Sequence, residues 1–159
     1  MYKEINRIKL KKLYSKNNVF DELVFHDGVN IILGEKYDNS TTRGRKTNGV
    51  GKSMSIEILD FCFLSNYDKK SRVYKIPKEL LPVDEEIILD LEIGKEDITI
   101  KRTRKDAQKP IILRNEKIVT FDKLNDARNY LTELIFAELG GKSVPSFRNL
   151  FSILIRDER

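Results

Sequence analysis

The sequence has few of the residues that build disulfides and metal sites. Its 159 residues include one cysteine, Cys62, and one histidine, His26. An intramolecular disulfide is therefore excluded, and a zinc site is not expected. Cys62 lies in the largely apolar run from Leu59 to Leu64, so we expect a buried structural thiol rather than a reactive one.

Long apolar stretches are also absent. No run approaches the ~18 apolar residues of a transmembrane helix, and residues 1–4 do not resemble a signal peptide. We therefore expect a cytoplasmic protein without a membrane contact. The chain is 40% hydrophobic and 35% charged, which suits one globular domain. Its net charge of +5, from 30 basic and 25 acidic residues, only weakly indicates an anionic partner such as nucleic acid.

Hydrophobic periodicity predicts a mixture of strands and helices. The expected strands, in chain order, cover 5–11, 23–25, a buried run at 29–33, a hairpin at 85–93 and 98–102, and a short pair flanking Asn115-Glu116. The first expected helix follows Ser53 and runs to about Leu64, and the second covers 122–139 before Gly140-Gly141. The segments 35–48 and 65–84 are predicted to be irregular. The apolar run 151–155 near the end leads us to expect that the natural chain continues.

The motif that carries chemistry is Gly49-Val50-Gly51-Lys52-Ser53, between the run at 29–33 and the following helix. Glycines let backbone N–H groups converge on phosphate oxygens, and a helix N-terminus adds its positive dipole end. A lysine reaches the β- and γ-phosphates, and a serine hydroxyl binds Mg²⁺. Such a strand, loop and helix indicate a phosphate-binding loop.

The spacing of this motif differs from the usual phosphate-binding loop. The usual pattern has a glycine five residues before the second one, and Lys46 stands there. Gly34 closes the preceding strand, so about twelve residues are inserted between the two halves of the motif. We expect Gly34 and Asn48 to lie close in space, with the insert forming an Ω-like loop. The alternative is a chance Gly-Lys-Ser triplet in a loop.

Residues 23–35 (LVFHDGVNIILGE) resemble the segment that leads into the ATP site of SMC- and RecN-type ABC ATPases. Residues 48–53 (NGVGKS) match the second part of that motif, and 58–64 (ILDFCFL) are similar to the helix that follows. The similarity covers at least residues 5–64. The inserted loop most resembles uncharacterised coiled-coil ATPases of bacterial defence loci.

The resemblance implies an α/β fold of the P-loop NTPase type, an ABC-type N-terminal lobe spanning 1–159. This lobe has a mixed β-sheet, a P-loop helix and an antiparallel hairpin subdomain. It implies ATP and Mg²⁺ as cofactors, with Ser53 as the magnesium ligand. The implied partners are DNA, a missing C-terminal lobe of the same protein, and a second head in a head-to-head homodimer. The implied nucleotide contacts are Gly34, Asn48, Gly49, Val50, Gly51, Lys52, Ser53, Met54, Ser15 and Lys16.

Several family elements depart from the pattern or are missing. An Arg-Ser pair of the family corresponds to Ser15 and Lys16 here, which could equally be an ordinary solvated turn. The family's glutamine loop corresponds to 155–158, where only Asp157 offers a weak replacement. No Leu-Ser-Gly-Gly signature occurs. Asp90 and the stretch 153–158 could be mistaken for a Walker B strand, and the second would make the chain a complete small ATPase.

Two basic segments have competing interpretations. The loop 35–48 could cover phosphates or contact DNA, or it could be a mobile surface loop. The run 101–105 (KRTRK) could contact a nucleic-acid backbone, but a solvated hairpin end is favoured. Two other functions therefore stay open beside the ATPase head. These are a compact P-loop kinase or GTPase, and a non-catalytic nucleic-acid-binding module.

Overall fold

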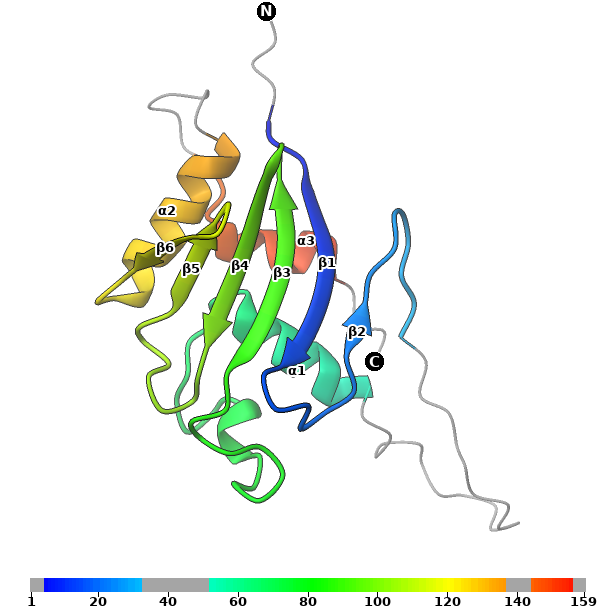
Figure 1. Cartoon of the computed structure of the whole chain (residues 1–159), viewed down its shortest axis with the longest axis vertical. Helices are drawn as coiled ribbons and strands as arrows, with labels where there is room; N and C mark the ends of the chain where they lie inside the picture. The colour runs from blue at the N-terminus through cyan, green and yellow to red at the C-terminus, as the bar shows by residue number, and fades with distance from the viewer. Residues whose placement is uncertain (1–4, 33–51, 137–143, 156–159) are drawn as a thin grey trace, which may run out of the picture.

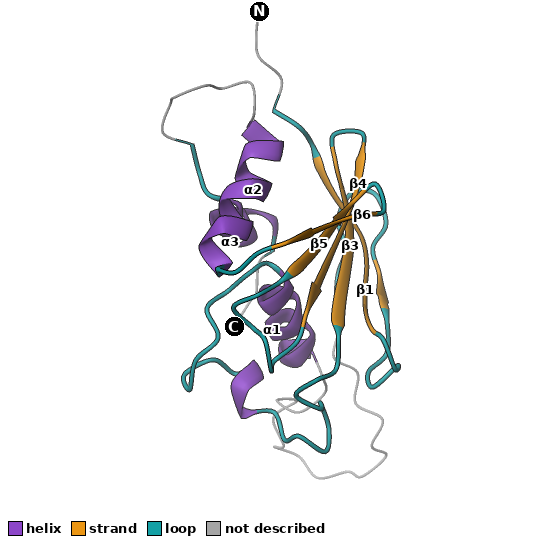
Figure 2. Cartoon of the chain, turned by 60° about the vertical axis from the view of Figure 1, so that its left-hand side comes forward, coloured by secondary structure: helices purple, strands orange, loops and turns teal. Residues whose placement is uncertain are grey.

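The computed structural model describes residues 5–32, 52–136 and 144–155. In these residues the chain forms an α/β fold with one six-stranded antiparallel sheet and three α-helices. The helices lie on the same face of the sheet, as the edge-on view in Figure 2 shows. No helix of the described residues lies on the opposite face.

The sheet has the order β2-β1-β3-β4-β5-β6 (Figure 1). The strands are β1 (Ile8–Ser15), β2 (Leu23–Val24), β3 (Ile87–Ile93), β4 (Glu96–Arg102), β5 (Ile111–Arg114) and β6 (Lys117–Thr120). All neighbouring strands pair antiparallel. The helices are α1 (Lys52–Cys62), α2 (Leu124–Phe136) and α3 (Phe151–Leu154), with 3₁₀ turns η1 (Val73–Lys75) and η3 (Phe147–Leu150).

The core lies between the sheet and the helices. Alternate residues of the central hairpin point into it, and Leu89, Leu91, Ile98 and Ile100 are fully buried. A register shift between Leu10 and Lys12 in β1 adds one residue there. Because of this bulge, both Leu10 and Leu13 pair with buried leucines of β3 and keep the core side of the sheet.

The hairpins and the two long helices confirm most of the element predictions. The turn between β3 and β4 has Gly94 at its first position with φ +64°, where a glycine is favoured. The turn between β5 and β6 has Asn115 and Glu116 at φ +48° and +67°, the pattern of a type I′ turn. α2 is described from Leu124 to Phe136, and the predicted stop at Gly140-Gly141 lies outside the described residues.

The predicted buried strand at 29–33 is wrong for the residues that the structure describes. Residues 29–32 form no strand, and Val29 and Ile31 are 90% and 76% exposed. The physical reason is the lack of a partner, since β2 pairs with β1 over only two residues and the described chain offers no strand beyond it. The family resemblance implied a mixed sheet, whereas the sheet in the described residues is wholly antiparallel.

The basic run 101–105 was expected either to contact nucleic acid or to be a solvated hairpin end, but two of its arginines are buried. Arg102 is 1% exposed, donates from Nη1 to the Phe61 carbonyl at 2.6 Å and from Nε to the Ala107 carbonyl at 2.8 Å. Its guanidinium lies over the Phe61 ring, 4.1 Å from the centroid. Burial lowers the pKa of Arg102 to about 10, which leaves it charged at neutral pH. Arg102 therefore caps the end of α1 and is unavailable to nucleic acid.

Arg104 donates hydrogen bonds to main-chain carbonyls of the irregular segment that follows α1. It is 4% exposed, and its Nη1 donates to the carbonyls of Val73 at 2.9 Å and Ile76 at 2.7 Å. Its Nη2 donates to the Leu81 carbonyl. A segment without regular structure leaves carbonyl groups unpaired, and one planar guanidinium satisfies three of them here.

We expect Arg102→Ala to lower the free energy of unfolding by about 3 kcal/mol or more, because it removes two charge-assisted hydrogen bonds and leaves buried carbonyls unpaired. Urea unfolding followed by circular dichroism measures this. Lys105→Ala is the matched control, since Lys105 is exposed in the same run, and it should change stability by less than about 0.5 kcal/mol. Equal effects of the two substitutions would contradict the capping role.

Candidate phosphate-binding site

The predicted phosphate motif runs into the first turn of α1. Lys52 and Ser53 are the first two residues of this helix, and Met54 follows at 41% exposure. Gly34, Asn48, Gly49, Val50, Gly51 and Asp157 lie outside the described residues. The main chain at Lys52 and Ser53 thus has the location that anion binding at a helix N-terminus requires.

Apolar side chains along one face of α1, at the positions that the sequence periodicity predicted, pack this helix against the sheet. Ile58, Leu59, Cys62 and Phe63 are all at most 4% exposed, and the helix contacts β3 and β4. Burying four such side chains contributes on the order of 1.5–3 kcal/mol each relative to leaving them in water. The direction of the helix axis is therefore set by the core.

The C-terminal end of α1 is held by polar contacts as well. Leu64 adopts φ +62°, which stops the helix. Arg128 of α2 donates to the Leu64 carbonyl from Nε at 2.9 Å and from Nη2 at 2.6 Å. Together with Arg102 on Phe61, this places two cations at the negative end of the helix dipole. The positive end of the dipole is at Lys52.

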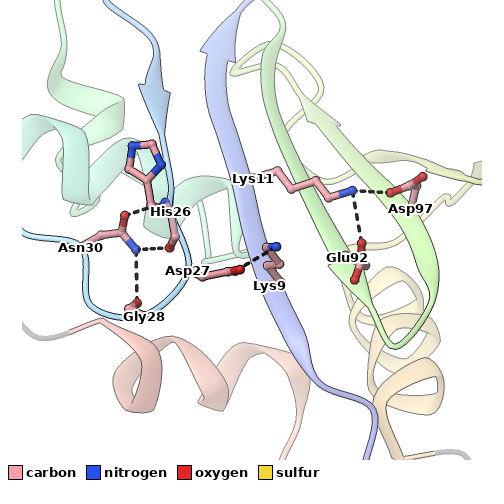
Figure 3. Close-up of polar contacts among 8 residues, drawn as sticks. All are labelled: Lys9, Lys11, His26, Asp27, Gly28, Asn30, Glu92 and Asp97. Atoms are coloured by element: carbon pink, nitrogen blue, oxygen red, sulfur yellow. Dashed lines mark hydrogen bonds and ion pairs between the residues drawn. The ribbon is translucent and has the colours of Figure 1, made fainter.

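Asn30, the asparagine of the Gly-Val-Asn sequence, closes the turn that precedes the motif (Figure 3). Its Oδ1 accepts from the His26 N–H at 2.8 Å, and its Nδ2 donates to the His26 carbonyl at 2.8 Å. Gly28, at φ +88°, allows the tight turn. Asp27 in the same turn forms an ion pair with Lys9 of β1 at 2.8 Å. Asn30 is thus a structural residue of this segment.

Ser15 and Lys16 lie at the end of β1. Ser15 is 1% exposed, and its Oγ accepts a hydrogen bond from the Val19 N–H at 2.8 Å. The Lys16 ammonium forms an exposed ion pair with Glu86 at 3.2 Å. The hydroxyl of Ser15 therefore closes the turn after β1, and Lys16 is a surface residue with a carboxylate partner.

The lysines of β1 and the following Lys16 each pair with a carboxylate. The pairs are Lys9–Asp27, Lys11–Glu92, Lys11–Asp97, Lys12–Glu22 and Lys16–Glu86. The hydrogen bond to Asp97 raises the pKa of Lys11, and the hydrogen bond from Lys9 lowers the pKa of Asp27. Figure 3 shows Lys11 between Glu92 and Asp97. A nucleic-acid backbone would have to displace these carboxylates.

Neither stretch considered for Walker B has the geometry of that motif. Asp90 accepts from the Thr99 hydroxyl at 2.6 Å, across a surface hairpin. Ile153 and Leu154 belong to the short helix α3, and Ile153 is 65% exposed. A Walker B aspartate follows a buried parallel strand instead. Asp157 and Glu158 lie outside the described residues.

In the described ranges 5–32, 52–136 and 144–155, no group of three or more His, Cys, Asp or Glu side chains could hold a metal ion. None of their helices is long and apolar enough to cross a membrane.

Sequence reasoning missed the four polar side chains around α1 that the structure brings together: Asp60, Arg102, Arg128 and Arg148. Arg148 of η3 forms an ion pair with Asp60 at 2.6 Å, and Phe147 beside it stacks on Phe63 with centroids 5.1 Å apart. The strand alternation could have indicated that Arg102 is buried, because Ile98, Ile100 and Arg102 are every second residue of β4 and point to the same side of the sheet. No comparable pattern marks Arg128 or Arg148.

Comparison with known proteins gave no match, either to a protein-family model, to a curated protein or to a solved structure. The interpretation of the site therefore depends on the motif and on the geometry of α1.

We expect Cys62 to be unreactive in the folded protein. It is completely buried, and burial raises its pKa to about 12. The reactive thiolate is therefore scarce at pH 8. Between pH 9.0 and about 12 the unfolded chain loses the thiol proton while the folded chain keeps it, so the free energy of unfolding falls over this range. An aromatic disulfide reagent at pH 8 should modify the thiol only after unfolding in urea. Rapid modification without denaturant would contradict the buried assignment.

Proposed function

We propose that this chain is the ATP-binding half of an SMC/RecN-like ABC ATPase head, with Mg²⁺ as the accompanying ion. The observation that carries the proposal is that Asn48-Gly49-Val50-Gly51-Lys52-Ser53 runs directly into the first turn of α1. The antiparallel hairpins and the helix 124–136 accord with the hairpin subdomain of such a lobe. A chance Gly-Lys-Ser triplet would not require a helix beginning at its lysine.

The fixed position of α1 supports the chemistry that this proposal needs. Phosphoryl transfer depends mainly on positioning and on electrostatic stabilisation of phosphate oxygens. The core stripe and the arginines at its far end hold α1, so its N–H groups need little reorganisation to meet an anion. In the proposed site Lys52 binds the β- and γ-phosphates, and the Ser53 hydroxyl ligates Mg²⁺.

The exposed apolar residues beside β2 support a missing second lobe. Val24, Val29 and Ile31 are each more than half exposed, although their pattern is that of a buried strand. We propose that a C-terminal lobe of the same protein covers them and supplies the signature motif and the catalytic acid. Two such heads would enclose ATP in a head-to-head homodimer and couple hydrolysis to DNA binding, repair or defence.

The two competing functions have less support. A compact kinase or GTPase needs a catalytic acid after a buried strand, and residues 151–154, upstream of Asp157, form the helix α3. A nucleic-acid-binding module needs free cations, whereas β1 has its lysines paired and the run 101–105 has Arg102 and Arg104 buried.

Lys52→Ala should weaken the binding of Mg·ATP to the purified chain at least about tenfold, because charge-assisted hydrogen bonds to the phosphates are lost. Isothermal titration calorimetry gives the dissociation constants. Lys117→Ala, which removes an exposed lysine from β6, should leave them unchanged. If Mg·ATP binds equally to wild type and to Lys52→Ala, the phosphate-loop proposal is wrong.

The purified chain alone should hydrolyse ATP very slowly or not at all, since it contains no signature motif and no Walker B strand in its described part. Phosphate release at saturating Mg·ATP measures the turnover. Robust turnover that disappears in Lys52→Ala would instead favour the compact enzyme, with Asp157 and Glu158 as the acids.

A further inference from the structure

A second polar region lies on the flank of α1, away from its N-terminus. It is a pocket of about 510 Å³ between α1, the loop 65–73, α2 and η3. Arginines from three of these segments line it: Arg72 from the loop, Arg128 from α2 and Arg148 from η3. We call it the arginine pocket. Its volume lies in the range of small-ligand sites.

The side chains that line the arginine pocket carry one more positive charge than negative charge. Glu57 and Asp60 of α1 face the arginines, at 3.3 Å from Arg72 and 2.6 Å from Arg148. The third carboxylate, Asp68, accepts from the N–H groups of Lys70 at 2.7 Å and Ser71 at 3.2 Å with one oxygen. Three carboxylates thus face three arginines and Lys70, and the charge of Asp68 is directed to the main chain of its own loop rather than to an arginine.

The contacts of Arg72 and Arg148 leave most of their donors available. In the described part of the chain each reaches its carboxylate through one terminal nitrogen. A guanidinium has five N–H groups in a planar fork, which matches a phosphoryl or carboxylate group. Arg128, by contrast, is committed to the Leu64 carbonyl and to the side chains of Asn66 and Asn125.

The surroundings favour an anion that would join these guanidinium groups. Burial and the nearby charge of Arg148 lower the pKa of Arg128, so the two cations destabilise one another. Burial raises the pKa of Asp60 although the charge of Arg148 opposes the shift, so desolvation outweighs this ion pair at Asp60. An anion between the arginines would relieve their mutual repulsion.

We propose that the arginine pocket binds the phosphoryl group of a small molecule, with Arg72 and Arg148 as its ligating side chains. This site is distinct from the one proposed at Lys52. Glu57 and Asp60 follow Lys52 by about two turns, or ~8–12 Å along the helix axis. An extended nucleic acid is a poorer occupant, because it requires a row of exposed cations rather than an open pocket between four segments.

The test is a titration of the purified chain with inorganic phosphate and, separately, with AMP, followed by amide NMR and calorimetry. Both ligands should shift amide signals in 65–73 and near Arg148. Arg72→Gln and Arg148→Gln should each weaken the affinity about tenfold, as expected for the loss of charge-assisted hydrogen bonds. Equal affinities would indicate that the free phosphate is recognised, and tighter AMP binding would indicate a phosphorylated metabolite.

The controls separate this proposal from the ATP site and from loss of folding. Arg114→Gln removes an arginine that is paired to Glu96 on another strand, and it should not affect binding. Lys52→Ala should leave phosphate binding in the pocket intact. Arg148→Lys retains the charge, so it should keep the fold and bind more weakly than wild type but more tightly than Arg148→Gln.

Three outcomes would overturn the proposal. The first is a set of shifts confined to residues 52–54 that disappears in Lys52→Ala. The second is unchanged phosphate affinity in both Arg72→Gln and Arg148→Gln, with thermal unfolding midpoints equal to that of wild type. The third is a response to duplex DNA at 65–73 without any response to phosphate or AMP, which would assign the pocket to nucleic acid.

Discussion

The carbonyl groups at the end of α1 and in the segment after it are satisfied by three arginine side chains. Arg102 binds the Phe61 carbonyl, Arg128 binds the Leu64 carbonyl, and Arg104 binds those of Val73, Ile76 and Leu81. Without these donors a helix end and an irregular segment would leave acceptors buried and unpaired. The position of α1 on the sheet depends on this arrangement.

The two ends of α1 are therefore electrostatically different. Its C-terminal end already has cations, and its core stripe resists displacement along the sheet. Its N-terminal end, at Lys52, is the positive end of the dipole and begins immediately after a glycine. A helix that is fixed at one end can offer preorganised N–H groups at the other, which is the physical requirement of a phosphate-binding loop.

Local patterns predicted the parts of the fold that local chemistry determines. The alternation of Ile87, Leu89 and Leu91 gave β3, and the glycine at 94 gave its turn. The stripe Ile58, Leu59 and Cys62 gave α1 and its buried face. For the candidate site, the sequence predicted a helix directly after the motif that ends at Ser53, and the structure has α1 from Lys52, so the last two motif residues belong to the helix.

Long-range contacts explain what the sequence could not show. A run of five polar and basic residues reads as solvated, yet Arg102 and Arg104 share the inward parity of Ile98 and Ile100 and therefore enter the core. Their burial depends on carbonyl groups 23 to 41 residues away, at Leu81 and Phe61. The ion pair of Asp60 with Arg148 spans still more sequence, so no local pattern could predict it.

The segment after β2 shows the reverse case. Its apolar pattern is clear, but the described sheet has no strand with which it could pair. Val29 and Ile31 have the composition of a buried strand, and a strand forms only when adjacent backbones complete its hydrogen bonds. In the described sheet, β1 occupies one side of β2, and no strand lies on the other. The apolar pattern thus predicts burial. Val29 and Ile31 are exposed because the described sheet has no second strand beside β2. The same reasoning makes this edge, rather than the covered face, the side on which a second lobe would add the most hydrophobic burial.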